Sequence, residues 1–203
     1  MDIDELISRL GKISVRPFFI FISGGSCSGK TFLAKKLMLL LKNDATLIEM
    51  DDYFKDREDE TLPMFGGKLS FDLPDSYHLD EIRQGLIELK ESKQISVPIY
   101  DIGSNKRIGR KVVEQKEIII VDGLYASKVS DAIVDVNQKI NVLILTSTHI
   151  RIQRRIKRDR ERFGCSSEEI INSFLKFVEP VDKLYVSKQK ADIIIQNNYR
   201  KGD

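Results

Sequence analysis

Short apolar runs alternate with longer helix-like stretches along this chain. Most of the runs are uninterrupted, as is typical of strands covered on both faces, and they lie at residues 18–22, 46–50, 118–121, 142–145 and 193–195. The helix-like stretches lie at residues 31–42, 79–91, 149–162 and 167–178. Strands that alternate with helices imply right-handed crossovers, so the pattern predicts an α/β fold with a parallel sheet layered between helices.

Two stretches depart from this alternation. Residues 52–78 are polar and rich in turn formers, whereas residues 95–100 and 106–113 flank a Gly-Ser-Asn turn. The second stretch predicts a β-hairpin over approximately 95–113. Both stretches are candidates for a flap that closes over a substrate.

Length and composition fit one globular domain over residues 1–203. Apolar residues make up 41% and charged residues 32%, and no apolar run approaches the roughly 20 residues that span a bilayer. The chain starts with acidic residues, unlike a secretory signal, and the pattern at 4–10 predicts a short amphipathic helix of structural role. We therefore expect a cytoplasmic protein with no membrane partner.

Charge and cysteine content narrow the function classes. A net charge of +2 is too close to neutral to indicate wholesale binding to nucleic acid, so an electrostatic function requires local clusters. Cys27 and Cys165 are the two cysteines, and their spacing fits neither a disulfide framework nor a metal site.

A glycine-rich segment directly follows the first predicted strand. It satisfies G-x-x-x-x-G-K-[ST] and runs into a predicted helix, the context that a phosphate-binding P-loop requires. Its N–H groups and the positive helix end attract phosphate oxygens, while Lys30 reaches the outer phosphates and the Thr31 hydroxyl binds Mg²⁺. The predicted nucleotide-binding residues are Gly24, Gly25, Ser26, Cys27, Ser28, Gly29, Lys30 and Thr31. The alternative is a glycine-rich turn that binds nothing.

Two aspartates follow other predicted strands. Asp122 ends a buried strand, the usual position of the carboxylate that holds magnesium directly or through water, or else it starts a turn. Asp51 ends the next strand after the P-loop helix, and parallel strands end on the same edge of a sheet. Asp51 can therefore face the phosphate site and accept the proton of an attacking hydroxyl, although Asp51 or Asp52 can instead cap the following turn.

The predicted helix in the segment of approximately 149–165 is rich in arginine: seven basic and two acidic residues lie between positions 151 and 162. At about 100° per residue, Arg151, Arg155, Arg158 and Arg162 lie within about 60° of arc, apart from an apolar stripe. Such a helix can form a lid whose guanidinium groups bind a triphosphate. The alternatives are a solvated face or a nucleic-acid patch, but the helix lacks aromatic residues for base stacking.

Together these segments resemble the uridine kinase branch of the phosphoribulokinase and uridine kinase family. The resemblance runs from about residue 24 to residue 192. Besides the P-loop it includes Met-Asp51-Asp-Tyr-Phe, Phe-Asp72-Leu-Pro-Asp-Ser-Tyr, Val-Pro-Ile-Tyr100-Asp, Ile-Ile-Ile-Val-Asp122-Gly, Arg-Arg155-Ile-Lys-Arg-Asp, Val-Glu-Pro180 and Lys190-Ala-Asp-Ile-Ile-Ile. It implies a P-loop NTPase fold, three-layer α/β/α with a five-stranded parallel sheet, a β-hairpin flap and an Arg-rich lid helix.

The resemblance also implies roles for individual residues. Asp51 matches the catalytic base, Asp72 the carboxylate that binds ribose hydroxyls, Tyr100 a flap residue near the base, and Arg155 and Arg158 the lid arginines.

Three further positions complete the predicted site. Asn105 stands where the family's nucleoside kinases usually carry a flap histidine, and Asp122 where the family often has Glu. Tyr53 and Phe54 offer aromatic faces to a base or sugar, or pack beneath the flap.

The predicted activity is Mg²⁺-dependent transfer of a phosphoryl group from ATP to the 5'-hydroxyl of uridine or cytidine. Alternatives are a family kinase with another nucleoside, a vitamin precursor or a sugar phosphate as acceptor, and a regulator that binds nucleotide without transfer. The chain has no N/T-K-x-D motif, which argues against a GTPase switch. A nucleic-acid-binding module is a more distant alternative, and the sequence leaves a homo-oligomer open.

Overall fold

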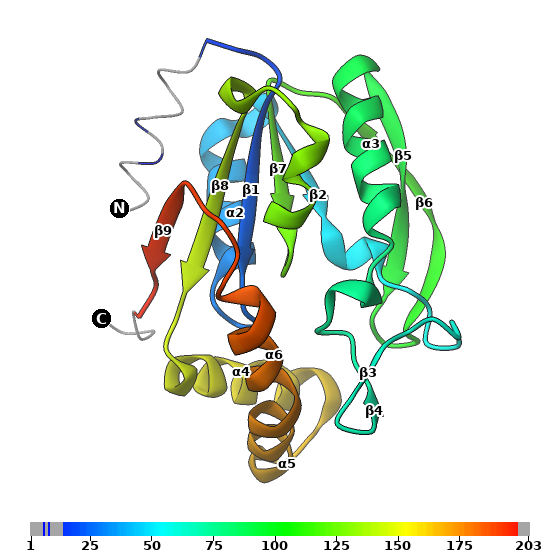
Figure 1. Cartoon of the computed structure of the whole chain (residues 1–203), viewed down its shortest axis with the longest axis vertical. Coiled ribbons are helices and arrows are strands. Elements are labelled where there is room, and N and C mark those ends of the chain that lie inside the picture. Colours follow the sequence, from blue (N-terminus) through cyan, green and yellow to red (C-terminus); the bar gives the residue numbers. More distant parts are fainter. Residues whose placement is uncertain (1–5, 7, 9–13, 199–203) are drawn as a thin grey trace.

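A five-stranded sheet forms the centre of the molecule, seen in a computed structural model that describes residues 6, 8 and 14–198 (Figure 1). Its strands are β1 (Phe18–Gly24), β2 (Ala45–Glu49), β7 (Ile118–Asp122), β8 (Lys139–Leu145) and β9 (Ile193–Gln196). They are ordered β2-β7-β1-β8-β9, and every neighbouring pair is parallel. The prediction of a parallel five-stranded sheet is confirmed.

Side chains of successive strand residues point to opposite faces, which gives the sheet two cores. Phe19 and Phe21 of β1 pack on one face with α3 (Leu79–Glu91), whereas Ile20 and Ile22 pack on the other with α2 (Lys30–Leu41). The sheet therefore lies between helical layers, as predicted. The helix predicted at 4–10 lies largely outside the described residues, although the described Leu6 is buried in the α2 core.

The carboxyl ends of the strands meet α4 (Thr148–Phe163), α5 (Ser167–Ser173) and α6 (Glu179–Val181) at one end of the molecule (Figure 1). Residues 167–178 were predicted as one α-helix, but π-helical turns occupy η7 (Phe174–Val178) and η8 (Asp182–Val186) on either side of α6. Pro180 has no N–H to donate to the preceding turn, which favours this departure from α-helical hydrogen bonding.

The predicted hairpin is formed by β5 (Gln94–Asp101) and β6 (Lys106–Glu114), which pair antiparallel beside α3 (Figure 1). The polar stretch 52–78 holds a small hairpin that the pattern did not predict, β3 (Met64–Phe65) with β4 (Lys68–Leu69). Short 3-10 turns are η1 (Lys42–Asp44), η2 (Met50–Tyr53), η3 (Pro74–Ser76), η4 (Ala126–Lys128), η5 (Ser130–Ala132) and η6 (Val136–Gln138). In the described part of the chain, no helix has the length and apolar character to cross a bilayer.

Candidate active site

A cleft of about 720 Å³ opens at the carboxyl edge of the sheet. Its walls come from the P-loop, the segment after β2, the hairpin and α4. Predicted site residues that line it are Ser26, Cys27, Gly29, Lys30, Thr31, Asp51, Phe54, Asp72, Tyr100, Asp122, Arg155 and Arg158. Residues that are far apart in the sequence thus share one polar cavity.

The P-loop connects β1 to α2 and leaves the start of that helix open to the cleft. Gly29 precedes α2 with a φ of 106°, a conformation that favours glycine, and no side chain caps the helix. Lys30 donates a hydrogen bond to the Gly25 carbonyl at 3.3 Å. Gly25 and Ser28 line a separate cavity behind the loop. Uncapped N–H groups at a helix start, with a lysine beside them, form a site for phosphate oxygens.

The predicted metal ligands lie together. The Thr31 hydroxyl donates to Oδ2 of Asp122 at 2.6 Å. Oδ1 of Asp122 is buried and accepts no hydrogen bond from the described residues, and burial raises the pKa of this carboxyl against the opposing effect of Lys30. A hydroxyl and an unpaired carboxylate oxygen suit Mg²⁺, which takes oxygen ligands and usually keeps waters and substrate phosphates in its shell.

Asp51 lies on η2, directly beyond β2, at the edge where Glu49 of β2 pairs with Asp122 of β7. Its side chain opens into the cleft and stays accessible, but surrounding protein atoms raise its pKa to about 6. Desolvation is the main cause, Lys30 opposes it, and the carboxylates of Asp122 and Glu49 add to it. A carboxyl with a pKa of about 6 is suited to act as a general base near neutral pH.

Aromatic side chains cluster at one end of the cleft. The Phe54 ring stacks on Tyr77 at 4.3 Å between centroids and contacts Phe71 and Tyr100 at 5.5 Å each. Asp72 lies beside them, and burial raises the pKa of its carboxyl against the effect of the lid arginines. The cluster provides flat apolar surface next to a carboxylate.

Tyr77 and Asp52 are site residues that sequence reasoning missed. Tyr77 is 3% exposed and lines the cleft, and its buried hydroxyl has no hydrogen-bond partner among the described residues. Asp52 holds both strands of the flap, because it accepts from the Tyr100 N–H at 3.2 Å and from Lys111 at 2.7 Å. Tyr77 ends the Phe-Asp-Leu-Pro-Asp-Ser-Tyr segment, which forms part of the family resemblance. The sequence could not show that its hydroxyl group is buried beside the cleft.

Two predicted substrate contacts lie outside the residues that line the cleft. Tyr53 is 3% exposed and belongs to the core under the flap, away from the cleft lining, because its side chain leaves η2 toward α3. Asn105 occupies the hairpin turn with a φ of 54°, outside the residues that line the cleft. Asparagine is one of the residues that tolerate a left-handed turn position, so the hairpin turn accommodates Asn105 here.

The lid arginines divide into two groups. Arg155 and Arg158 face the cleft and share Asp159, whose carboxylate accepts from Arg155 at 3.0 Å and from Arg158 at 2.7 Å. Arg151, expected on the same outward face, is instead 3% exposed and buried behind the P-loop. Arg154, which the sequence did not single out, donates to the carbonyls of Cys27 and Ser28 at 3.2 and 3.1 Å.

The P-loop, the sheet order and the lid together define a P-loop kinase. Residues 19–201 match the sequence model of the phosphoribulokinase / uridine kinase family. The chain therefore belongs to this family and is an enzyme. It is 34% identical over 183 residues to a uridine kinase of Brevibacillus brevis, covering 88% of this chain and 84% of that protein. A uridine kinase of Staphylococcus aureus is also 34% identical, over 184 residues, with 87% and 86% covered.

Solved structures show the same fold. A possible uridine kinase from Bacillus stearothermophilus superposes with a TM-score of 0.65 at 19% identity, covering 95% of this chain and 96% of that one. D-glycerate 3-kinase from Cryptococcus neoformans superposes with a TM-score of 0.64 at 11% identity, covering 96% and 93%. At these identities the likeness concerns the fold alone.

Proposed function

We propose that this kinase transfers the γ-phosphoryl group of ATP to the 5'-hydroxyl of uridine or cytidine, in the cytoplasm. The observation that carries the proposal is the shared cleft, in which a carboxyl with a pKa of about 6, Asp51, lies between a phosphate loop and an aromatic pocket. The names of the curated relatives, which are uridine kinases, support this acceptor.

Each part of the cleft has a task in the proposed reaction. Asp51 accepts the proton of the attacking hydroxyl, while Lys30, Arg155 and Arg158 neutralise the charge that spreads over the phosphate oxygens. Mg²⁺, held by Thr31 and Asp122, would neutralise charge on the outer phosphates.

The acceptor is proposed to bind between the aromatic cluster and Asp72. The rings around Phe54 and Tyr100 contact the base, and the Asp72 carboxylate accepts from ribose hydroxyls. Closing the hairpin and the lid over the cleft keeps water from the phosphoryl group, which limits hydrolysis of ATP.

A screen of acceptors by ADP release tests this proposal. Purified protein with Mg·ATP is offered uridine, cytidine, purine nucleosides, a sugar phosphate and a vitamin precursor, each against a blank without acceptor. We expect ADP release that depends on uridine or cytidine. Release with another acceptor alone would replace the pyrimidine assignment, and tight ATP binding without transfer to any acceptor would favour a nucleotide-binding regulator.

A further inference from the structure

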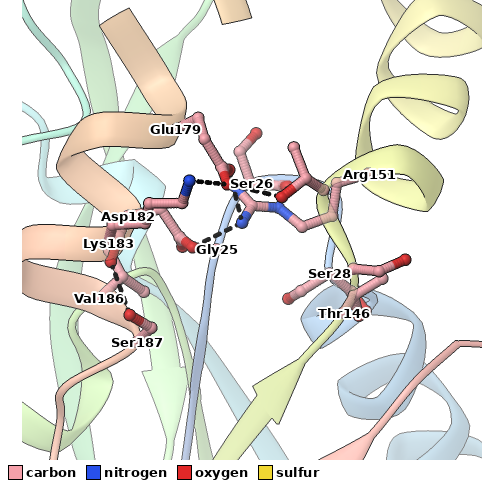
Figure 2. A network of polar contacts seen from close by, with 12 residues as sticks. Gly25, Ser26, Ser28, Thr146, Arg151, Glu179, Asp182, Lys183, Val186 and Ser187 are labelled. Atoms are coloured by element: carbon pink, nitrogen blue, oxygen red, sulfur yellow. Dashed lines mark hydrogen bonds and ion pairs between the residues drawn. The ribbon is translucent and has the colours of Figure 1, made fainter. Parts of the chain in front are cut away.

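A buried polar network lies behind the P-loop (Figure 2). Its centre is Arg151 of α4, which donates from Nε to the Ser26 carbonyl at 3.1 Å and from Nη1 to Asp182 at 2.5 Å. Glu179 approaches the same Nη1 atom at 3.3 Å. The cavity beside this network, about 330 Å³, shares no lining residue with the catalytic cleft, so Arg151 acts on the loop from its far side.

The segment around α6 is shaped to hold Arg151. Glu179 and Asp182 lie three positions apart, between or beside the π-helical turns η7 and η8, and both carboxylates point toward the Arg151 guanidinium, as Figure 2 shows. Thr148, in the first turn of α4, donates to Glu179 at 2.6 Å, which joins the two helices a second time. π-helical turns are uncommon and often occur at functional sites.

The contact with Ser26 fixes the direction of one peptide group of the P-loop. In a trans peptide the carbonyl and the following N–H point in opposite directions. When Arg151 holds the Ser26 carbonyl behind the loop, the Cys27 N–H is aimed toward the cleft, where phosphate oxygens bind. Arg155 adds a contact from the cleft side, because it donates to the Ser26 hydroxyl at 3.2 Å.

Close packing against Gly25 restricts the backbone conformation of the P-loop. A methyl group on Gly25 would collide with the Asp182 carboxylate and with the Arg151 guanidinium. The network is therefore in direct contact with the P-loop backbone and supports it, rather than acting through intervening side chains.

We propose that Arg151, oriented by Glu179 and Asp182, is a positioning residue that sets the P-loop backbone for binding the phosphates of the nucleotide. It links the lid helix, α6 and the P-loop, and it is not among the residues that line the cleft. The inference deepens the proposed function, on which its catalytic readout rests, while its binding readout needs only a nucleotide.

The test replaces Arg151 by lysine, which keeps the positive charge. Lysine lacks the planar guanidinium group that lets Arg151 contact the Ser26 carbonyl and both carboxylates at once. Binding of Mg·ADP is measured by calorimetry without acceptor, followed by steady-state kinetics. We expect the Kd for ADP and the KM for ATP to rise about tenfold, while the KM for the acceptor changes by less than about twofold. The matched control is Arg83→Lys, which alters exposed contacts of α3 with Asp80 and Asp131 and should leave ADP binding unchanged.

Asp182→Asn is the second variant, because it removes one of the two carboxylates that orient Arg151 while keeping the side chain's shape. It should weaken ADP binding in the same direction, by about threefold. The proposal is overturned if folded Arg151→Lys has a Kd for ADP within about 1.5-fold of that of the unmodified protein, because the network would then serve stability alone. If Arg151→Lys does not fold, the same criterion applies to Asp182→Asn. An unmodified protein that binds ADP but transfers to no acceptor would refute the proposed function and leave this binding test intact.

Discussion

Replacing Asp51 by asparagine is expected to stabilise the folded protein near neutral pH while it removes the proposed base. The surroundings raise the pKa of Asp51 from 3.8 to about 6, desolvation acting against Lys30. The folded state therefore holds this proton more tightly than the unfolded chain does. It follows that ionised Asp51 destabilises the folded state above about pH 6, that the effect fades between pH 6 and 3.8, and that it is absent below.

The size of the gain follows from the same pKa. A rise from 3.8 to about 6 corresponds to about 3 kcal/mol at 1.36 kcal/mol per pH unit. Because the side chain is accessible in the cleft, solvent screening reduces this to about 1 kcal/mol. For a domain of this length, that is about 2–4 °C in Tm.

The assay is thermal unfolding of the unmodified protein and of Asp51→Asn at about pH 7.5 and about pH 4. Asp75→Asn, which changes an exposed aspartate on η3, is the control and should shift Tm at neither pH. We expect Asp51→Asn to gain stability at the higher pH only. A variant that is less stable at pH about 7.5, or whose gain persists at pH about 4, would refute the reasoning.

Three further substitutions separate the tasks of the cleft. Tyr77→Phe removes only the hydroxyl, which has no partner in the described part of the chain, and should raise the KM for the acceptor about tenfold with the KM for ATP unchanged, measured by steady-state kinetics; an acceptor KM equal to that of the unmodified protein would remove Tyr77 from the acceptor site. Asp122→Asn should weaken Mn²⁺ binding in the presence of ADP by about tenfold, measured by electron paramagnetic resonance; unchanged Mn²⁺ affinity would contradict its role as a ligand. Arg158→Met should lower kcat about a hundredfold with ADP affinity nearly kept, and a drop in affinity alone would reassign it to ground-state binding.

Most of the fold was predictable because its signals are local. Apolar runs, most of them uninterrupted, marked the strands of the central sheet, since buried parallel strands have no polar face. The P-loop motif identified the turn between β1 and α2 in the same way. Local patterns did not reveal the π-helical turns around α6, because hydrogen bonding there departs from the helical period at Pro180.

The site was less predictable because side-chain direction depends on distant partners. Asp51 and Asp122 could be placed at one edge because each follows a strand and parallel strands end on the same edge of a sheet. Periodicity put Arg151 on the outward face of α4, but its carboxylate partners lie about thirty positions further along and bury it. Likewise, the sequence could not show that Tyr53 turns toward α3, since the alternation of faces breaks down in a 3-10 turn.

The most direct test of the central claim follows the phosphoryl group itself. ATP labelled at the γ-position is incubated with uridine and with either the unmodified protein or Asp51→Asn. The two proteins are first shown to bind ADP with the same affinity. We predict labelled nucleoside 5'-monophosphate from the unmodified protein, and essentially none from the variant. Equal amounts of labelled product from both proteins would contradict the account, because phosphoryl transfer would then proceed without the Asp51 carboxylate.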